Sequence, residues 1–287
     1  MITNTTYALY LTILLALSSL FTIAQCQSSF AESVLITGAN RGQGLEWVRQ
    51  LVALEEPPEY IFATARVTNN TRYLYKLNEI AEASTQSKVI ILKLDVTNET
   101  DIDNVSATLR NELGERGLNV IINNAGYFDR STGSLYTTTS ESMLHTFQVN
   151  AVGPLLITRK LAPLLKTAAT RYGIREGTGT RMSIARSGVI NISSVMGSIT
   201  RSSGGYYSYR MSKAALNMAT KSMAEDLKSN GIMVVAFHPG WVRTRMGGIN
   251  AKIEATDAVR SMLRTVTALD ETNTGGYFNR LGVAIEY

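Results

Sequence analysis

Short apolar runs alternate with amphipathic stretches along most of the chain. The apolar runs are rich in Val and Ile and end in turn residues, which predicts strands at 33–38, 59–65, 88–96, 118–126, 187–194 and 232–240. Helical periodicity between them predicts helices at 45–54, 101–114, 140–165 and 209–229. Strands that are apolar almost throughout are typical of a parallel sheet covered on both faces.

The alternation of strand and helix predicts an α/β fold. We expect a single domain of the Rossmann type, in which about seven parallel strands form a doubly wound sheet with helices on both faces. Ligands of such sheets bind beyond the carboxyl ends of the strands. Candidate site residues are therefore sought where the predicted strands end.

The first residues differ from the rest of the chain. Residues 7–24 carry no charged side chain, and small residues at Ala24 and Cys26 suit cleavage by a signal peptidase. Residues 1–26 are therefore expected to be a signal peptide for the secretory pathway, followed by a folded domain over 32–287. An apolar stretch of about 18 residues is also long enough for an uncleaved membrane anchor.

A secretory location would make Asn-x-Ser/Thr triplets candidates for glycosylation. They lie at Asn69, Asn98, Asn104 and Asn191. Asn191 falls in a predicted buried strand, so we expect it to stay unmodified.

Composition and charge narrow the classes of function. The chain has 45% hydrophobic and 18% charged residues, a net charge of +5 and a pI of about 9.3. Its Lys and Arg residues are scattered, which favours a phosphate-bearing small molecule over nucleic acid as the anionic partner. One cysteine and two histidines exclude an intrachain disulfide and argue against a metal centre or a Ser-His-Asp triad.

The sequence TGANRGQGLE, residues 37–46, joins the first predicted strand to the first helix. Gly38, Gly42 and Gly44 permit a tight turn, close approach of a pyrophosphate to the backbone and close helix packing, with the helix N-terminus facing the anion. The loop therefore predicts a dinucleotide site. Its glycine spacing is wider than in the commoner G-x-G-x-x-G pattern.

With this loop spacing, the chain resembles the short-chain dehydrogenase/reductase family. The resemblance continues in family order through NNAG at 123–126, Asn150, Ser194, the Tyr209 and Lys213 pair, and PGWVRT at 239–244. Within the family, the chain most resembles the carbonyl reductases of the sniffer and C-factor group, which are cytoplasmic as a rule. The resemblance implies an NADP(H) site formed by Gly38, Asn40, Arg41, Gly42, Gly44, Arg66, Asp95, Val96, Asn123, Ala125, Gly126, Tyr209, Lys213, Pro239, Gly240, Val242 and Thr244.

Charge at the end of the second predicted strand favours NADP(H) over NAD(H). Enzymes that choose NAD usually place an acidic residue there for the ribose 2′-hydroxyl, whereas this chain has Arg66 and no acidic residue before Asn69. Arg41 adds a second guanidinium, and two such groups suit a 2′-phosphate. Asp95 and Asn123 resemble family residues that touch adenine and stabilise the central sheet, although either could be a turn-forming residue.

Three tyrosines compete for the chemistry in YYSYRMSK, residues 206–213. A free phenol has a pKa of about 10, so proton transfer near neutrality calls for a cation one helical turn away. Tyr209 has Lys213 at that offset and Tyr207 has a methionine. Tyr206 has Arg210, but a guanidinium suits carboxylate or phosphate better, and Tyr206 is expected to precede the regular helix.

The resemblance implies that Asn150, Ser194, Tyr209 and Lys213 are catalytic. Tyr209 would exchange a proton with the substrate oxygen, and Lys213 would lower the pKa of Tyr209 and bind the nicotinamide ribose. Ser194 would hydrogen-bond the substrate carbonyl. The backbone carbonyl of Asn150 would hold a water that links Lys213 to solvent.

Several serines near the end of the fifth predicted strand compete for the role of Ser194. Ser193 should face the opposite side of the strand from Ser194. The gap from Ser194 to Tyr209 is 15 positions, longer than is usual in the family, so Ser198 and Ser202 stay as competitors.

These residues together predict an NADPH-dependent oxidoreductase that reduces an aldehyde or ketone to an alcohol. The alternatives are a steroid- or retinol-type alcohol dehydrogenase with the same site, and a non-catalytic NADP(H)-binding signalling protein. Thr244 would hold the nicotinamide carboxamide, and residues 248–267 are expected to form a substrate lid. Family members commonly pair through the two long helices, which predicts a homodimer or homotetramer.

Overall fold

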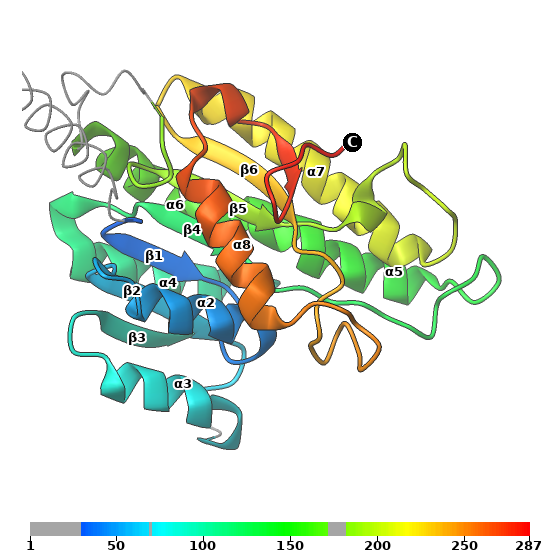
Figure 1. Cartoon of the computed structure of the whole chain (residues 1–287), viewed down its shortest axis with the longest axis horizontal. Helices are drawn as coiled ribbons and strands as arrows, with labels where there is room; N and C mark the ends of the chain where they lie inside the picture. Colours follow the sequence, from blue (N-terminus) through cyan, green and yellow to red (C-terminus); the bar gives the residue numbers. More distant parts are fainter. Residues whose placement is uncertain (1–29, 69–70, 172–181) are drawn as a thin grey trace, which may run out of the picture.

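A seven-stranded parallel sheet forms the centre of the molecule (Figure 1). The computed structural model describes residues 30–68, 71–171 and 182–287. The strand order is β3-β2-β1-β4-β5-β6-β7, and it runs outward in both directions from β1 and β4. The predicted doubly wound Rossmann-type sheet is therefore confirmed. The strands are β1 (Ser33–Ile36), β2 (Tyr60–Ala65), β3 (Lys88–Lys93), β4 (Val120–Asn123), β5 (Gly188–Ile192), β6 (Met233–His238) and β7 (Tyr277–Asn279).

Helices cover both faces of this sheet. The first face carries α2 (Gly42–Val52), α3 (Thr71–Ala83) and α8 (Ala255–Thr267), and Figure 1 shows α8 lying next to α2 in front of the strands. The second face carries α4 (Glu99–Leu113), α6 (Gly153–Arg171) and α7 (Tyr207–Lys228), with α5 (Ser140–Phe147) packed beside α7. Each layer buries its own apolar core against the sheet, as the amphipathic patterns require.

Three elements were not located from the sequence. Helices α3 and α8 lie where no helix was predicted, and strand β7 is only three residues long. The expectation that 248–267 forms a lid is wrong for its second half, because Val259, Met262 and Val266 on α8 are fully buried in the core. Their spacing places them on one face of a helix.

The predicted single helix at 140–165 is in fact three segments. Helix α5 ends at Phe147, a π-helical turn covers η2 (Gln148–Val152), and α6 begins at Gly153. Pro154 explains the break in part, because a proline has no N–H and cannot donate to the carbonyl four residues earlier, which is that of Asn150. Turns of this type are frequent at functional sites.

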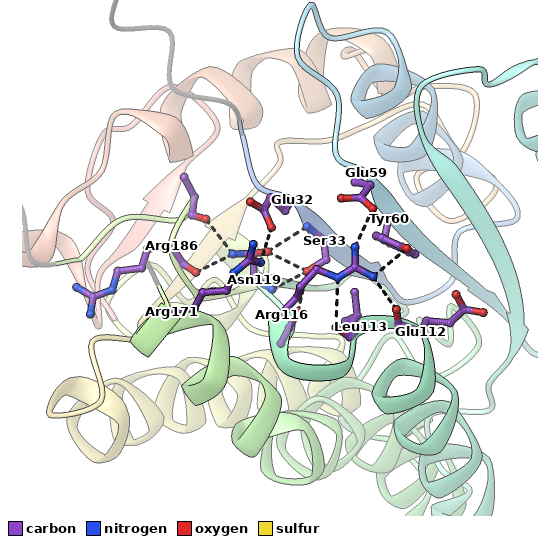
Figure 2. A network of polar contacts seen from close by, with 12 residues as sticks. Glu32, Ser33, Glu59, Tyr60, Glu112, Leu113, Arg116, Asn119, Arg171 and Arg186 are labelled. Carbon is purple, nitrogen blue, oxygen red and sulfur yellow. Dashed lines mark hydrogen bonds and ion pairs between the residues drawn. The ribbon is translucent and has the colours of Figure 1, made fainter. Parts of the chain in front are cut away.

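A buried polar cluster fixes the amino-terminal edge of the central strands (Figure 2). Asn119, directly before β4, accepts from the backbone N–H and the hydroxyl of Ser33 on β1 at 3.1 and 2.9 Å. Its side-chain amide donates to the carbonyls of Ala185 and Arg186, which precede β5. One side chain therefore joins the starts of three adjacent strands, at the edge opposite the predicted site.

The triplets predicted for glycosylation differ in their accessibility. Asn98 is exposed and caps α4 by accepting from the N–H of Asp101, Asn104 is exposed on α4, and Asn191 is fully buried in β5. Asn69 and the predicted signal segment at 1–26 lie outside the described residues. Among the described helices, none is long and apolar enough to cross a membrane.

Candidate active site

The glycine-rich loop after β1 is shaped as the sequence predicts. Gly38 and Gly42 have positive φ angles of 66° and 55°, which side-chain-bearing residues rarely adopt. A Cβ on Gly44 would lie 2.2 Å from the carbonyl oxygen of Gly38, so helix α2 can approach the strand only with glycine there. No side chain caps the first turn of α2, and that turn contains no acidic residue. Its N–H groups and the helix dipole therefore suit a phosphate.

Two residues missed by the sequence reasoning hold this loop against the end of β4. The Thr37 hydroxyl accepts from the backbone N–H groups of Asn124 and Ala125 at 3.0 and 2.9 Å. The Asn124 side chain donates to the carbonyls of Thr37 and Gly38. The NNAG motif carried a signal for this role, because an asparagine side chain at a strand end commonly bonds neighbouring backbone.

Asn123 has the sheet-stabilising contact that the resemblance implied. Its amide donates to the side-chain oxygen of Asn191 on β5 at 2.9 Å. Asp95 makes a local turn, because its carboxylate accepts from the N–H and hydroxyl of Thr97. The structure therefore shows the turn-forming role that the sequence left open for Asp95. The Asp95 side chain is half-buried.

Arg41 and Arg66 lie at the same edge of the sheet. Arg41 is the residue before α2, and Arg66 directly follows β2. Both side chains are exposed, and Arg66 makes no hydrogen bond or ion pair with any described residue. The loop after β6 also reaches this edge, since a Cβ on Gly42 would lie 3.3 Å from Thr244. The other predicted cofactor residues lie in the loops that follow β1, β3, β4 and β6 at this edge: Asn40, Val96, Ala125, Gly126, Pro239, Gly240 and Val242.

Asn150 is fully buried in the π-helical turn. Its side chain accepts from the N–H of Tyr127 at 2.8 Å, and donates to the carbonyl of Tyr127 and to the hydroxyl of Ser212. It thereby ties the loop after β4 to α7. A Cβ on Gly126 would lie 3.4 Å from Asn150 Oδ1 and 3.9 Å from Lys213 Nζ, so the three residues surround one space.

The two serines after β5 have different partners on α7. Ser193 donates to Asn217 Oδ1 on α7 at 2.6 Å. The Ser194 hydroxyl accepts from the N–H of Met196 and lies close enough to Tyr209 to lower the pKa of its phenol. Ser198 accepts from the N–H of Arg201, and Ser202 is exposed. The structure therefore brings Ser194, rather than its competitors, to Tyr209.

Tyr209 and Lys213 lie on successive turns of α7. The Lys213 ammonium is 5.7 Å from the centre of the Tyr209 ring and donates to the carbonyl of Ile192 at 2.7 Å. Burial raises the pKa of Tyr209 to about 12 and lowers the pKa of Lys213 to about 7. The expectation that Lys213 lowers the pKa of Tyr209 is therefore wrong for this structure. Desolvation disfavours both charged forms, and the ammonium is bonded to a backbone carbonyl.

Tyr206 lies outside the helix, as predicted. Helix α7 begins at Tyr207, and Tyr206 has a left-handed φ of 47°. Arg210 does not pair with its hydroxyl, because the guanidinium donates to the carbonyls of Gly204 and Gly205 and to Ser203. Tyr206 therefore lacks the cationic partner that made it a competitor.

Phe128 is a site residue that the sequence did not reveal. Its ring centre lies 4.7 Å from that of Tyr209 and 5.2 Å from that of Tyr206. The neighbouring Arg130 donates to the carbonyl of Met246 at 2.6 Å, so the loop after β4 is joined to the loop after β6. A single aromatic residue in a loop has no pattern that would have identified this contact.

The glycine loop, the β4 loop and the Ser194, Tyr209 and Lys213 cluster meet at the carboxyl edge of the sheet, where dinucleotide-binding α/β proteins bind their ligands. The family model described as short chain dehydrogenase matches residues 32–254. The chain belongs to the short chain dehydrogenase family, a family of oxidoreductases, as its motifs predicted.

Three proteins show what this chain is similar to. The carbonyl reductase Sniffer of D. melanogaster has 37% sequence identity and a TM-score of 0.82, with 90% of this chain and 100% of that chain covered. The NADPH-bound carbonyl reductase from chicken fatty liver has 35% identity and a TM-score of 0.82, with 90% and 99% covered. C-signal of Myxococcus xanthus is 38% identical over 175 residues, which are 59% of this chain and 93% of that protein.

Proposed function

We propose that the protein is an NADPH-dependent reductase that converts an aldehyde or ketone into an alcohol. The observation that carries the proposal is the position of the Ser194 hydroxyl, which lies beside Tyr209 with Lys213 one turn further along α7. Similar solved structures described as carbonyl reductases, one of them NADPH bound, support it. A protein that only binds a nucleotide has no need of this proton-transfer group.

The cofactor site fits a phosphorylated dinucleotide. The positive φ angles of Gly38 and Gly42 and the uncapped first turn of α2 leave backbone N–H groups for a pyrophosphate. Arg41 and Arg66 would bind the 2′-phosphate with charge-assisted hydrogen bonds. Thr244, in contact range of the glycine loop, would bind the carboxamide. When bound, the cofactor supplies the hydride.

The chain's own residues would handle the proton and the substrate oxygen. The Ser194 hydroxyl accepts from the N–H of Met196, so its proton remains for donation to the carbonyl oxygen. Tyr209, a neutral phenol because of its raised pKa, would donate its proton to the same oxygen as negative charge develops there. Lys213, linked to solvent by a water that the carbonyl of Asn150 would hold, would return a proton to Tyr209. Phe128 covers one side of the Tyr209 ring and would help to exclude water.

A carbonyl screen with NADPH and NADH tests the proposal. We expect the chain from residue 32 onward to oxidise NADPH with at least one aldehyde or ketone, and to use NADH at least tenfold less efficiently. Tight NADPH binding without oxidation of NADPH by any carbonyl would instead indicate a binding protein.

The charge at residue 66 tests the choice of cofactor. Arg66→Asp should lower the kcat/KM ratio of NADPH to NADH by roughly 100-fold, because a carboxylate repels a 2′-phosphate and accepts from a 2′-hydroxyl. Arg264→Asp is the matched control: it makes the same charge change in the last turn of α8, which runs back to the opposite edge of the sheet. An unchanged ratio in Arg66→Asp would remove the charge argument.

A further inference from the structure

A buried tyrosine on the last strand contacts the backbone of Ser194. Tyr277 on β7 is 2% exposed, and its hydroxyl donates to the carbonyl oxygen of Ser194 at 2.5 Å. The two residues are 83 positions apart in the sequence. We propose that Tyr277 is a positioning residue, which fixes the backbone of Ser194 so that the serine hydroxyl faces Tyr209.

Ser194 has few other backbone restraints. Strand β5 ends at Ile192. The last backbone hydrogen bond between this segment and β6 joins the N–H of Ser193 to the carbonyl of Phe237 at 2.7 Å. Beyond that point, the carbonyl of Ser194 accepts from the N–H of Gly197 within its own short turn. Tyr277 is therefore the contact that ties the Ser194 carbonyl to the sheet itself.

Helix α7 also holds this segment. Asn217 accepts from the Ser193 hydroxyl at 2.6 Å and donates to the carbonyl of Gly197 at 3.3 Å. Asn217 thus fixes the residues on both sides of Ser194, and Tyr277 fixes Ser194. Rotation of this peptide would turn the Ser194 hydroxyl away from Tyr209.

The hydroxyl of Tyr277 stays a donor throughout the working pH range. Burial and the nearby phenol of Tyr209 raise its pKa, while hydrogen bonds with Asn217 and Ser193 and the charge of Arg201 act in the opposite direction. Because the phenol remains neutral, its loss would change the environment of Tyr209 through the placement of Ser194 rather than through a lost charge. Lys213 is the cation next to Tyr209, and it is left in place.

The structure offers a matched control for this contact. The Tyr287 ring lies 5.6 Å from that of Tyr277, and its hydroxyl also donates to a backbone carbonyl at 2.5 Å, that of Gly275. Tyr277→Phe and Tyr287→Phe each remove one such bond and keep the ring. Only Tyr277→Phe removes a contact with Ser194.

The role assigned to Tyr277 rests on the proposed function, so the test includes one readout that needs no turnover. Tyr277→Phe should lower kcat for carbonyl reduction about tenfold, the effect of one lost hydrogen bond, with NADPH affinity within about twofold of the wild type. With [¹³C]Cζ-tyrosine, the NMR signal assigned to Tyr209 by its loss in Tyr209→Phe should change its chemical shift at neutral pH in Tyr277→Phe, because a displaced Ser194 no longer hydrogen-bonds the phenol. Tyr287→Phe should change neither.

Two results would overturn the inference. One is a Tyr209 chemical shift in Tyr277→Phe identical to that of the wild type, and the other is an equal loss of kcat in Tyr277→Phe and Tyr287→Phe. A wild-type protein that oxidises no NADPH would refute the proposed function alone, because the NMR chemical shift of Tyr209 would still decide whether Tyr277 controls Ser194.

Discussion

Tyr209 and Tyr206 both touch the ring of Phe128, yet only Tyr209 lies beside Ser194 and Lys213. Tyr209→Phe should therefore lower kcat about a thousandfold, the contribution of a positioned general acid. NADPH affinity should stay within about twofold, because the phenyl ring remains. The measurement is steady-state NADPH oxidation together with fluorescence titration of NADPH.

Tyr206→Phe is the control for this substitution. It keeps the aromatic contact with Phe128 and removes a hydroxyl with no lysine one turn on, so kcat should change less than about twofold. A dead Tyr206→Phe variant with an active Tyr209→Phe variant would show that the proton donor has been assigned to the wrong residue.

The pKa of Tyr209 predicts different pH profiles for the two directions of the reaction. Carbonyl reduction needs the phenol, which a pKa of about 12 keeps protonated through neutral and moderately alkaline pH. Alcohol oxidation needs the phenolate, whose fraction rises about tenfold per pH unit below the pKa. We therefore expect kcat/KM for oxidation to keep rising up to about pH 10, while reduction shows no loss from ionisation of Tyr209 over that range.

The same profiles test the sequence-based expectation for Lys213. If oxidation reached a plateau near pH 8, the ammonium of Lys213 would lower the pKa of Tyr209 during turnover. Lys213→Met should then move the plateau to higher pH. If burial alone sets the pKa of Tyr209, Lys213→Met should leave the pH profile of oxidation unchanged.

The sequence predicted the identity of the reacting side chains better than their environment. Helical spacing selected Tyr209 over Tyr206, because that periodicity is local, and the match to the family motif selected Ser194 over Ser193. The direction of the Tyr209 pKa shift was missed, since it depends on how deeply the phenol is buried. Phe128 and Tyr277 were also missed, because their contacts join segments that are distant in the sequence.

At the scale of elements, the loops after β4 and β6 are joined by one exposed arginine. Arg130 donates to the carbonyl of Met246 at 2.6 Å, and a Cβ on Gly248 would lie 3.0 Å from its guanidinium. Arg130→Ala should raise KM for the carbonyl about fivefold, because the two loops that border the reacting residues would separate more readily. NADPH affinity should change less than KM for the carbonyl, since the glycine loop, Arg41 and Arg66 are untouched.

Arg130→Lys provides the comparison for this loop contact. It keeps the charge and one donor, so part of the low KM should return. An unchanged KM in Arg130→Ala would show that the bond between the loops has no part in substrate binding.

Element boundaries were predicted where a single pattern decided them. The six longer strands were located, and their carboxyl ends correctly indicated where the site forms. Strand β7 was missed because three residues cannot show alternation. The break within 140–165 had a sequence signal in Gly153 and Pro154, but apolar periodicity continues through it, so the pattern favoured one long helix.

At the scale of the whole molecule, the buried cluster around Asn119 lies where the central strands start (Figure 2), whereas Ser194 follows the end of β5, so the cluster and the reacting residues lie at opposite edges of the sheet. Stability and activity should therefore separate. Asn119→Ala leaves the Ser33 hydroxyl and the carbonyls of Ala185 and Arg186 without the partner they have now. Since Asn119 is 1% exposed, we expect the free energy of unfolding to fall by about 3 kcal/mol.

A loss of this size should lower Tm by about 8 °C for a chain of this length, with kcat and KM at 25 °C unchanged within about twofold. Asn104→Ala, an exposed position on α4, is the control and should shift Tm by less than about 2 °C. Thermal unfolding by circular dichroism and steady-state kinetics on the same samples measure both quantities. A parallel loss of kcat in Asn119→Ala would contradict this separation. It would mean that the starts of β1, β4 and β5 set the geometry of the residues at the far ends of these strands.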